Sequence, residues 1–289
     1  MECMIEIENL SLTMKKQVIL SDINLTFEKG KIHGLIGRNG SGKTMLMKCI
    51  LGFIRPSQGT IWVDHKRIGK EVDFPPHTGV IIETPGFIPH YSGYKNLKVL
   101  AELNGKIDRG QIIHTMELVG LNPNLRRPIK KYSLGMRQRL GIAQAIMEEP
   151  NLLVLDEPFN GLDAEGVLQM RKLLLGKKAL GTTILLSSHN AEDIETLCDT
   201  VSKMEPVSYT HLDVYKRQAW KRLIMFLQLV RRICFPKKLR MVLMLSLIHI
   251  YRAFQYDMPD KATVLATDGE DKNVLNFDSN SVYQVSNSN

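Results

Sequence analysis

Alternating hydrophobic and polar residues predict a β-rich beginning to the chain. Met4–Leu12 and Val18–Phe27 alternate as two strands, with a turn at Lys15–Gln17 between them. Lys31–Ile36 alternates as a shorter strand, and the apolar residues of Met45–Leu51 then recur at helical spacing. A strand and a helix therefore flank the glycine-rich stretch between residues 36 and 45.

Farther along the chain, strand-like and helix-like patterns alternate. Strands are predicted at Thr60–Val63, Gly79–Ile82, Leu152–Leu155, Thr183–Leu186 and Val201–Met204. Helices are predicted at Tyr94–Leu103, Arg109–Val119, Leu140–Met147, Ala164–Leu180 and from Ala191 onward. This order predicts an α/β fold with a parallel-sheet core, an N-terminal antiparallel β subdomain and an inserted helical subdomain over residues 91–131. Ligands of such sheets bind at the C-terminal ends of the parallel strands.

Composition narrows the class of protein. The 289 residues are 44% hydrophobic, which is enough for a packed core. The four cysteines stand singly without a C-x-x-C pair, so neither a zinc site nor a disulfide framework is indicated and a reducing cytosol fits best. The N-terminus lacks the pattern of a signal peptide, and no apolar run reaches the ~18 residues that span a bilayer. We therefore expect that any function at a membrane requires a partner protein that spans it.

The net charge of +8 is weak support for nucleic-acid binding, because it is unevenly placed. Residues 1–206 carry an excess of +3 and residues 207–289 an excess of +5. Most basic residues of the second part fall between Lys216 and Arg240, in a stretch whose origin is doubtful for the reasons given below. We expect no nucleic-acid partner.

The glycine-rich stretch matches the phosphate-binding pattern G-x-x-x-x-G-K-[ST] at every fixed position. Glycines let backbone N–H groups turn toward a phosphate at a helix N-terminus, where the helix dipole favours anions. Lys43 is expected to meet the β- and γ-phosphates, and Thr44 to offer its hydroxyl to Mg²⁺. The nucleotide-binding residues predicted here are Gly37, Arg38, Asn39, Gly40, Ser41, Gly42, Lys43 and Thr44.

Polar residues that follow two of the apolar strands are candidates for the chemistry. Asp156 ends a buried strand and is expected to hold Mg²⁺, through water, because a buried carboxylate needs a cation or donors. Glu157 is placed to orient or deprotonate an attacking water, and His189 to contact the γ-phosphate and Glu157. The alternatives are a strand-end cap at Asp156, a solvent-facing Glu157 and a structural His189.

Five motifs in this order resemble the nucleotide-binding domain of an ATP-binding cassette (ABC) transporter, over Met1 to about Met204. Beside the phosphate loop they are a signature at Ser133–Gln138, the strand end Asp156-Glu157, Gly161–Asp163 and the switch histidine His189. The resemblance implies an ATPase that uses ATP and Mg²⁺ and drives a separate integral membrane transport subunit from the cytoplasmic face of the cell membrane. Glu157, His189 and Lys43 are then its catalytic residues.

The resemblance also implies a head-to-tail dimer with two ATP molecules at the seam. In the family, Ser133 and Gly135 cap the γ-phosphate bound by the opposite subunit, and Asp163 lies at the same seam. Gln138 belongs to the same signature and is included among the nucleotide-binding residues. The alternative is a plain N-cap serine followed by a glycine.

Two residues depart from the family pattern. Met14 stands where the family usually has an aromatic residue that stacks on adenine, and a methionine packs against a ring less rigidly. Glu83 stands where the family commonly has a glutamine that contacts Mg²⁺ and the attacking water. Together, Ile82–Pro85 and Ser133–Met136 resemble the bacitracin-resistance and lantibiotic-immunity exporters, which act on peptide antibiotics.

After Pro206 the sequence changes character. With permitted codons, Val207–Gln218 back-translates to DNA that is almost its own reverse complement, and Leu245–Ile250 is the same DNA in another frame. That DNA resembles a transposon-end sequencing adapter, so residues 1–206 are interpreted as the ABC domain without its last strands and residues 207–289 as a non-native or disordered tail. The polar end from Asp268 predicts disorder. The alternative for residues 207–289 is a real accessory domain, in which Lys216–Leu247 is basic and apolar enough for a membrane-surface helix.

Two other functions remain open from the sequence. One is a soluble ABC-type ATPase that acts as a switch on nucleic acid or ribosomes, although such proteins usually carry two cassettes or long inserted arms. The other is an inactive cassette that has lost its terminal strands.

Overall fold

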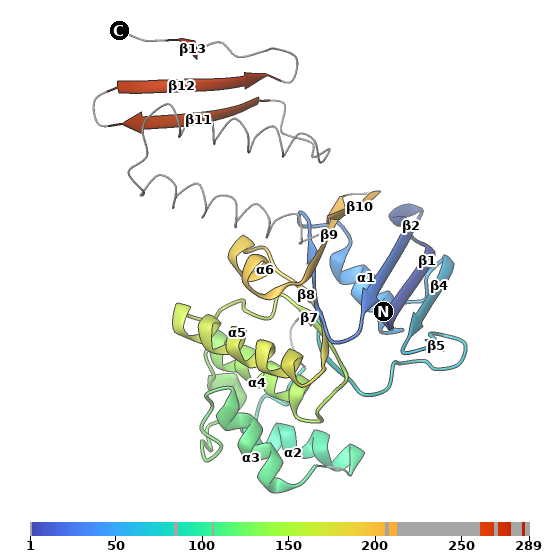
Figure 1. Cartoon of the computed structure of the whole chain (residues 1–289). Coiled ribbons are helices and arrows are strands. Elements are labelled where there is room, and N and C mark those ends of the chain that lie inside the picture. The colour runs from blue at the N-terminus through green and yellow to red at the C-terminus, as the bar shows by residue number, and fades with distance from the viewer. Residues whose placement is uncertain are drawn as a thin grey trace. The chain divides into compact units, whose positions relative to one another are not determined.

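The computed structural model of the chain describes residues 2–83, 86–105, 107–205, 208–212, 261–268, 271–278 and 285–286 (Figure 1). The chain divides into two compact units, Met1–Ala219 and Trp220–Asn289.

The first unit begins with an antiparallel sheet of order β2-β1-β4-β5. Its two long strands form a hairpin in which Leu12 lies opposite Leu20 and Ile7 opposite Leu25. Leu12, Leu20, Ile7 and Leu25 are all buried, because alternate residues of a strand face the same side. The predicted N-terminal β subdomain is confirmed, with strands β1 (Cys3–Met14), β2 (Gln17–Glu28), β4 (Gln58–Val63) and β5 (Lys66–Arg67).

The second sheet has the order β10-β9-β3-β8-β7-β6, and its strands from β9 to β6 run parallel. Every residue of β7 and β8 is buried, as their apolar sequences predict. The strand that follows β9 pairs with it antiparallel and begins at Ser208, within the segment that resembles adapter DNA. The strands are β3 (Ile32–Ile36), β6 (Thr78–Ile81), β7 (Leu152–Asp156), β8 (Thr183–Ser187), β9 (Thr200–Glu205) and β10 (Ser208–Leu212).

The helices follow the predicted order, with one clear difference in extent. The helices are α1 (Lys43–Ile50), α2 (Gly93–Asn104), α3 (Arg109–Leu118), the 3₁₀ turn η1 (Ile129–Lys131), α4 (Leu134–Ile146), α5 (Ala164–Ala179) and α6 (Ala191–Leu197). Helix α4 starts six residues before the predicted Leu140, since the Ser133 hydroxyl caps it by accepting from the Met136 N–H at 3.1 Å. Gly135, predicted to lie just before a helix, is therefore inside its first turn. Within the described residues, no helix combines the length and hydropathy of a membrane span.

The parallel sheet separates two hydrophobic cores. Leu152 and Val154 of β7 pack with the antiparallel sheet and α1, whereas Leu153 and Leu155 pack on the other face with the residues of α2 to α6. Figure 1 shows α4, α5 and α6 on this second side of the sheet. Strands β7 and β8, whose C-terminal ends carry Asp156, Glu157 and His189, are thus held between packed layers.

A buried histidine on β3 makes stability sensitive to acid. His33 is 1% exposed; its Nε2 donates to the Glu28 carbonyl at 2.9 Å, and its Nδ1 lies 2.6 Å from Thr200 Oγ1. Burial lowers the pKa of His33 from its ordinary value of 6.5. The unfolded chain therefore binds a proton on this side chain at a higher pH than the folded chain does.

We expect the free energy of unfolding to fall as the pH drops from 6.5, the unfolded-state pKa, to the lower pKa that His33 has in the folded protein. The loss should approach about 1 kcal/mol per pH unit within that window. Urea unfolding at pH 7.5 and pH 5.5 measures it, and His33→Gln should show a smaller difference between the two conditions. An equal difference in both proteins would mean that other groups carry the acid sensitivity.

The second unit contains a three-stranded antiparallel sheet of order β11-β12-β13. Its strands are β11 (Lys261–Asp268), β12 (Asp271–Asp278) and β13 (Val285–Ser286). Val264 lies opposite Leu275 and Leu265 opposite Val274. Strands β12 and β13 lie in the stretch from Asp268 onward, for which the polar composition predicts disorder. The alternative membrane-surface helix at 216–247 lies outside the described residues, and the non-native origin of residues 207–289 stays a prediction.

Candidate nucleotide and metal site

The phosphate loop joins β3 to α1, and close packing explains two of its glycines, Gly37 and Gly42. A Cβ on Gly37 would lie 2.3 Å from the Met204 carbonyl oxygen and 2.5 Å from Ser41 Oγ. Gly42 has φ +95°, and a Cβ there would lie 2.6 Å from Leu20 Cδ2. L-residues rarely adopt this backbone conformation, so position 42 requires glycine both for its φ angle and for the lack of space for a Cβ.

Polar groups inside the loop fit a phosphate. Lys43 is 6% exposed, and its Nζ donates to the carbonyls of Gly37 at 2.8 Å and Arg38 at 3.3 Å. The buried Ser41 hydroxyl has no hydrogen-bond partner within the described part of the chain. A buried hydroxyl without a partner is costly, so a phosphate oxygen that accepted from it would relieve the penalty. The loop therefore fits the anion that its sequence predicts.

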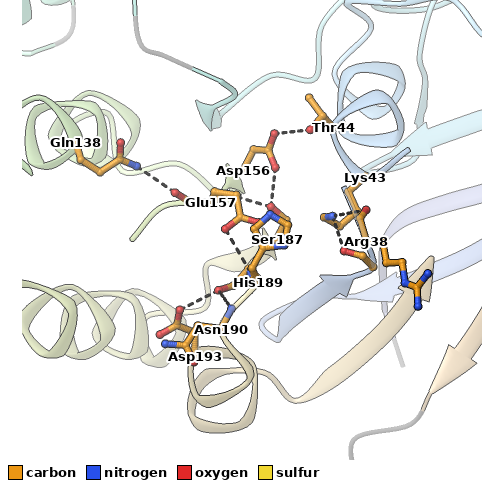
Figure 2. Close-up of polar contacts among 12 residues, drawn as sticks. Arg38, Lys43, Thr44, Gln138, Asp156, Glu157, Ser187, His189, Asn190 and Asp193 are labelled. Carbon is orange, nitrogen blue, oxygen red and sulfur yellow. Dashed lines mark hydrogen bonds and ion pairs between the residues drawn. The ribbon is translucent and has the colours of Figure 1, made fainter. Parts of the chain in front are cut away.

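Asp156 lies between two hydroxyl groups from neighbouring elements. Thr44 Oγ1 donates to its Oδ2 and Ser187 Oγ donates to its Oδ1, each at 2.6 Å (Figure 2). A carboxylate beside a threonine hydroxyl is an oxygen donor set that suits Mg²⁺. Among the described residues, no three His, Cys, Asp or Glu side chains gather as a metal site, so the remaining oxygens would come from phosphates and water.

Glu157 and His189 lie against each other at the ends of β7 and β8. The His189 N–H donates to Glu157 Oε2 at 3.3 Å, and His189 Nε2 lies 3.0 Å from Oε1 (Figure 2). Burial raises the pKa of Glu157, and the nearby imidazole partly opposes that rise. Glu157 also has φ +50°, an uncommon backbone conformation for glutamate.

Ser187 is the site residue to which the sequence assigned no role. Its Oγ donates to Asp156 and accepts from the Glu157 N–H at 3.0 Å, so one hydroxyl fixes two neighbouring acids. The available signal is its position as the polar residue that ends a fully buried strand, two residues before His189.

The signature residues divide between the surface and the interior. Ser133 is exposed at the N-terminus of α4, and a Cβ on Gly135 would lie 2.8 Å from the Gly161 carbonyl oxygen. Gln138 is 9% exposed, and its Nε2 donates to the carbonyls of Pro158 at 2.9 Å and Glu157 at 3.3 Å. Gln138 thus ties α4 to the chain segment that follows β7 in the same molecule.

The other predicted residues lie outside this hydrogen-bonded centre. Met14 is 40% exposed at the end of β1. Glu83 pairs with Lys48 of α1 at 2.5 Å and has φ +56°. Asp163 caps α5 by accepting from the Gly166 N–H at 3.0 Å. The structure thus brings Lys43, Thr44, Asp156, Glu157 and His189 to the ends of adjacent strands and leaves Met14, Glu83 and Asp163 at the periphery.

Comparison with known proteins agrees with this geometry. The profile of the family described as "ABC transporter" matches residues 20–160. The chain is 43% identical over 201 residues to the uncharacterized ABC transporter ATP-binding protein YybJ of Bacillus subtilis strain 168; the match covers 70% of this chain and 92% of that protein. It is 44% identical over 210 residues to the bacitracin transport ATP-binding protein BcrA of Enterococcus faecalis, covering 71% and 67%.

The chain is also similar to a lantibiotic transport protein and to a solved structure. The chain is 38% identical over 198 residues to the lantibiotic transport ATP-binding protein SrtF of Streptococcus pyogenes, covering 68% of this chain and 85% of that protein. The solved structure of cbiO1 from Clostridium perfringens, part of the ABC transporter complex cbiONQ, is 26% identical with a TM-score of 0.65. It covers 79% of this chain and 96% of its own.

Proposed function

The chain belongs to the ATP-binding proteins of ABC transporters, an ATP-hydrolysing family that powers transport, and from this premise we propose which of its residues do the work. The observation that carries the assignment is the continuous set of contacts from Thr44 through Asp156 and Ser187 to Glu157 and His189. This set joins the Thr44 hydroxyl and the carboxylates of Asp156 and the half-buried Glu157 beside the phosphate loop, which supports the assignment.

Residues 37–44 are assigned to the phosphates of ATP. Backbone N–H groups of the loop and the buried Ser41 hydroxyl, which has no partner in the described part of the chain, would donate to phosphate oxygens. Lys43 would exchange its bonds to loop carbonyls for bonds to the β- and γ-phosphates. Thr44 and Asp156 would hold Mg²⁺, which supplies charge neutralisation on the phosphate oxygens when bound. Met14 is assigned to packing against the adenine ring. Glu83 is assigned to the side of the site where Mg²⁺ and the attacking water bind.

Glu157 is assigned as the base and His189 as its partner. The raised pKa of Glu157 makes its carboxylate a better proton acceptor, provided that it is ionised at working pH. The His189 ring, 3.0 Å from Oε1, orients this carboxylate and offers a donor to the γ-phosphate. Glu157 then accepts a proton from the attacking water while the water oxygen bonds to the γ-phosphorus and the bond from the γ-phosphorus to the bridging oxygen breaks, so that ADP leaves.

The partners are proposed to be a second copy of the chain and an integral membrane subunit. Ser133 is exposed at a helix N-terminus, which favours an anion, and would cap the nucleotide of the opposite copy with Gly135. Gln138, predicted to bind nucleotide, is buried and instead holds α4 to the segment after β7 in its own molecule. Asp163, whose side chain is 79% exposed, would lie at the same seam. Docking on the membrane subunit would place the chain at the cytoplasmic face of the cell membrane.

The cargo is proposed to be a peptide antibiotic that the complex exports. The similarity to BcrA and SrtF, named for bacitracin and lantibiotic transport, supports this assignment. The motifs Ile82–Pro85 and Ser133–Met136 point to the same group of transporters.

A complementation experiment tests the head-to-tail dimer. Lys43→Ala should disable a phosphate loop and Ser133→Arg a signature, so each variant alone should retain below about 1% of the ATPase rate. A mixed dimer keeps one intact site, built from one subunit's loop and the other's serine. We expect an equal mixture to recover up to about a quarter of the wild-type rate.

The control for this experiment is a mixture of Lys43→Ala with the double variant Lys43→Ala/Ser133→Arg, which cannot form an intact site. Recovery in the test mixture at the level of this control would count against composite sites shared between two copies. ATP binding by the Ser133→Arg variant alone should persist, because its own phosphate loop is unchanged.

A further inference from the structure

The loop that carries His189 is fixed to the helix that follows it. Asn190 caps α6 by accepting from the Glu192 N–H at 2.9 Å, and the Asn190 N–H donates to Ser188 Oγ at 3.1 Å. Ser188 Oγ in turn donates to Asp193 Oδ2 at 2.8 Å (Figure 2). The residues on either side of His189 therefore depend on the position of Asp193.

Asp193 is itself held by an arginine from another helix. Its Oδ1 accepts from Arg171 Nε at 2.9 Å and from Nη2 at 2.5 Å, and Arg171 Nη1 contacts Glu192 Oε1 at 3.0 Å. The side chains of Arg171 and Asp193 are only 7% and 4% exposed. A buried ion pair of this kind is weak support for stability, but its two-point contact fixes the relative position of α5 and α6.

Helix α6 depends on such contacts because it is short. It has seven residues, fewer than an isolated helix needs to persist in water. Its buried face comprises Ile194 and Leu197 beside Asp193, so packing and the ion pairs of Arg171 with Asp193 and Glu192 set the direction in which the helix starts. Any shift of its first turn moves the His189 loop.

We propose that Arg171 and Asp193 form a positioning clamp that, through Ser188, holds His189 against Glu157. The clamp rests on the proposed function in that His189 is taken to assist Glu157 in ATP hydrolysis. Arg171 and Asp193 do not belong to the contacts around the reacting groups, and they act through the loop. Ser187 fixes the other end of this loop to Asp156, so the histidine is supported from both sides.

The clamp predicts a loss of rate without a loss of ATP binding. Ser188→Ala removes only the hydroxyl that joins the loop to Asp193, and Arg171→Lys keeps the charge but loses the two-point contact. In the full chain, each should lower kcat about tenfold and change the KM for ATP less than about twofold. An unchanged kcat in a folded Ser188→Ala protein would overturn the clamp.

The matched control is Lys178→Gln on the same helix. Lys178 pairs with Asp199 at 2.6 Å just beyond α6, but this pair does not contact the His189 loop. We expect its kcat to stay within about twofold of wild type. A tenfold loss in this control as well would show that any weakening of α5 is enough, and would count against a specific clamp.

Two further measurements separate positioning from general support. In a His189→Ala background, Ser188→Ala should have no further effect on kcat, because the group being positioned is already absent. If the double variant instead lost kcat by the product of the two single-variant factors, the proposal would be overturned. Without nucleotide, the amides of His189 and Asn190 should exchange hydrogen faster in Arg171→Lys than in wild type or Lys178→Gln.

The exchange measurement does not depend on hydrolysis. Unchanged exchange in Arg171→Lys would overturn the clamp whatever the ATPase rates are. A Glu157→Gln protein with wild-type activity would instead count against the assigned catalytic roles alone, so the two failures can be told apart.

Discussion

Glu157→Gln is expected to lower the steady-state rate of ATP hydrolysis by a factor of at least about 100 while ATP binding persists. The amide keeps the size of the side chain and still accepts a hydrogen bond from the His189 N–H, but it cannot take a proton from water. The affinity for ATP, measured by titration calorimetry, should change little because the phosphate loop is untouched.

The pH dependence of hydrolysis gives a second readout for the same residue. Because burial raises the pKa of Glu157, the wild-type rate should fall as the pH drops through that raised value and protonates the base. The residual rate of the variant should lack this acidic limb. Glu165→Gln is the control, since Glu165 is exposed in the first turn of α5. A Glu157→Gln protein with near wild-type turnover would refute the assignment.

Gly37→Ala is expected to abolish ATP binding and to destabilise the fold. The added Cβ would lie 2.3 Å from the Met204 carbonyl oxygen, and backbone on both sides of this contact cannot yield as a flexible side chain would. Overpacking of this kind costs about 2 kcal/mol or more, and the displaced loop should lose its phosphate contacts. Thermal unfolding and ATP titration measure the two effects.

Gly176→Ala is the matched control for this substitution. A Cβ on Gly176, in the interior of α5, meets nothing within 4 Å. We expect it to raise stability by about 0.5–1 kcal/mol, because alanine favours the helix, and to leave ATP affinity unchanged. Similar losses in both variants would mean that the contact with Met204 does not decide the outcome at Gly37.

The sequence predicted the elements and the site where the signals are local. Two periods of hydrophobicity distinguish β1 and β2 from α2 and α3, and the apolar runs of β7 and β8 mark strands buried on both faces. The positions of Glu157 and His189 just beyond such runs predict that these two residues meet, and in the structure they do. Parallel strands present their C-terminal ends at one edge, so this step needs no tertiary information.

Features that depend on long-range contacts escaped the sequence. Arg171 reads as one more basic residue on a helix, because its partner Asp193 lies 22 positions later on another element. The pairing of Lys48 with Glu83 is hidden in the same way across 35 positions. The start of α4 was placed too late because Gly135 usually disfavours a helix, whereas the Ser133 cap and the close approach to Gly161 hold it in one.

The contact between Gly37 and Met204 sets a practical limit on shortening this protein. Met204 belongs to β9 and is 1% exposed, and its backbone packs directly against Gly37 of the phosphate loop, although it lies outside every recognisable motif. A shortened version that ended before β9 would keep the phosphate loop, the signature and the catalytic pair, yet would leave the loop without its backing. Fragments and fusion partners for this ATPase should therefore be joined after residue 205, so that all of β9 is retained.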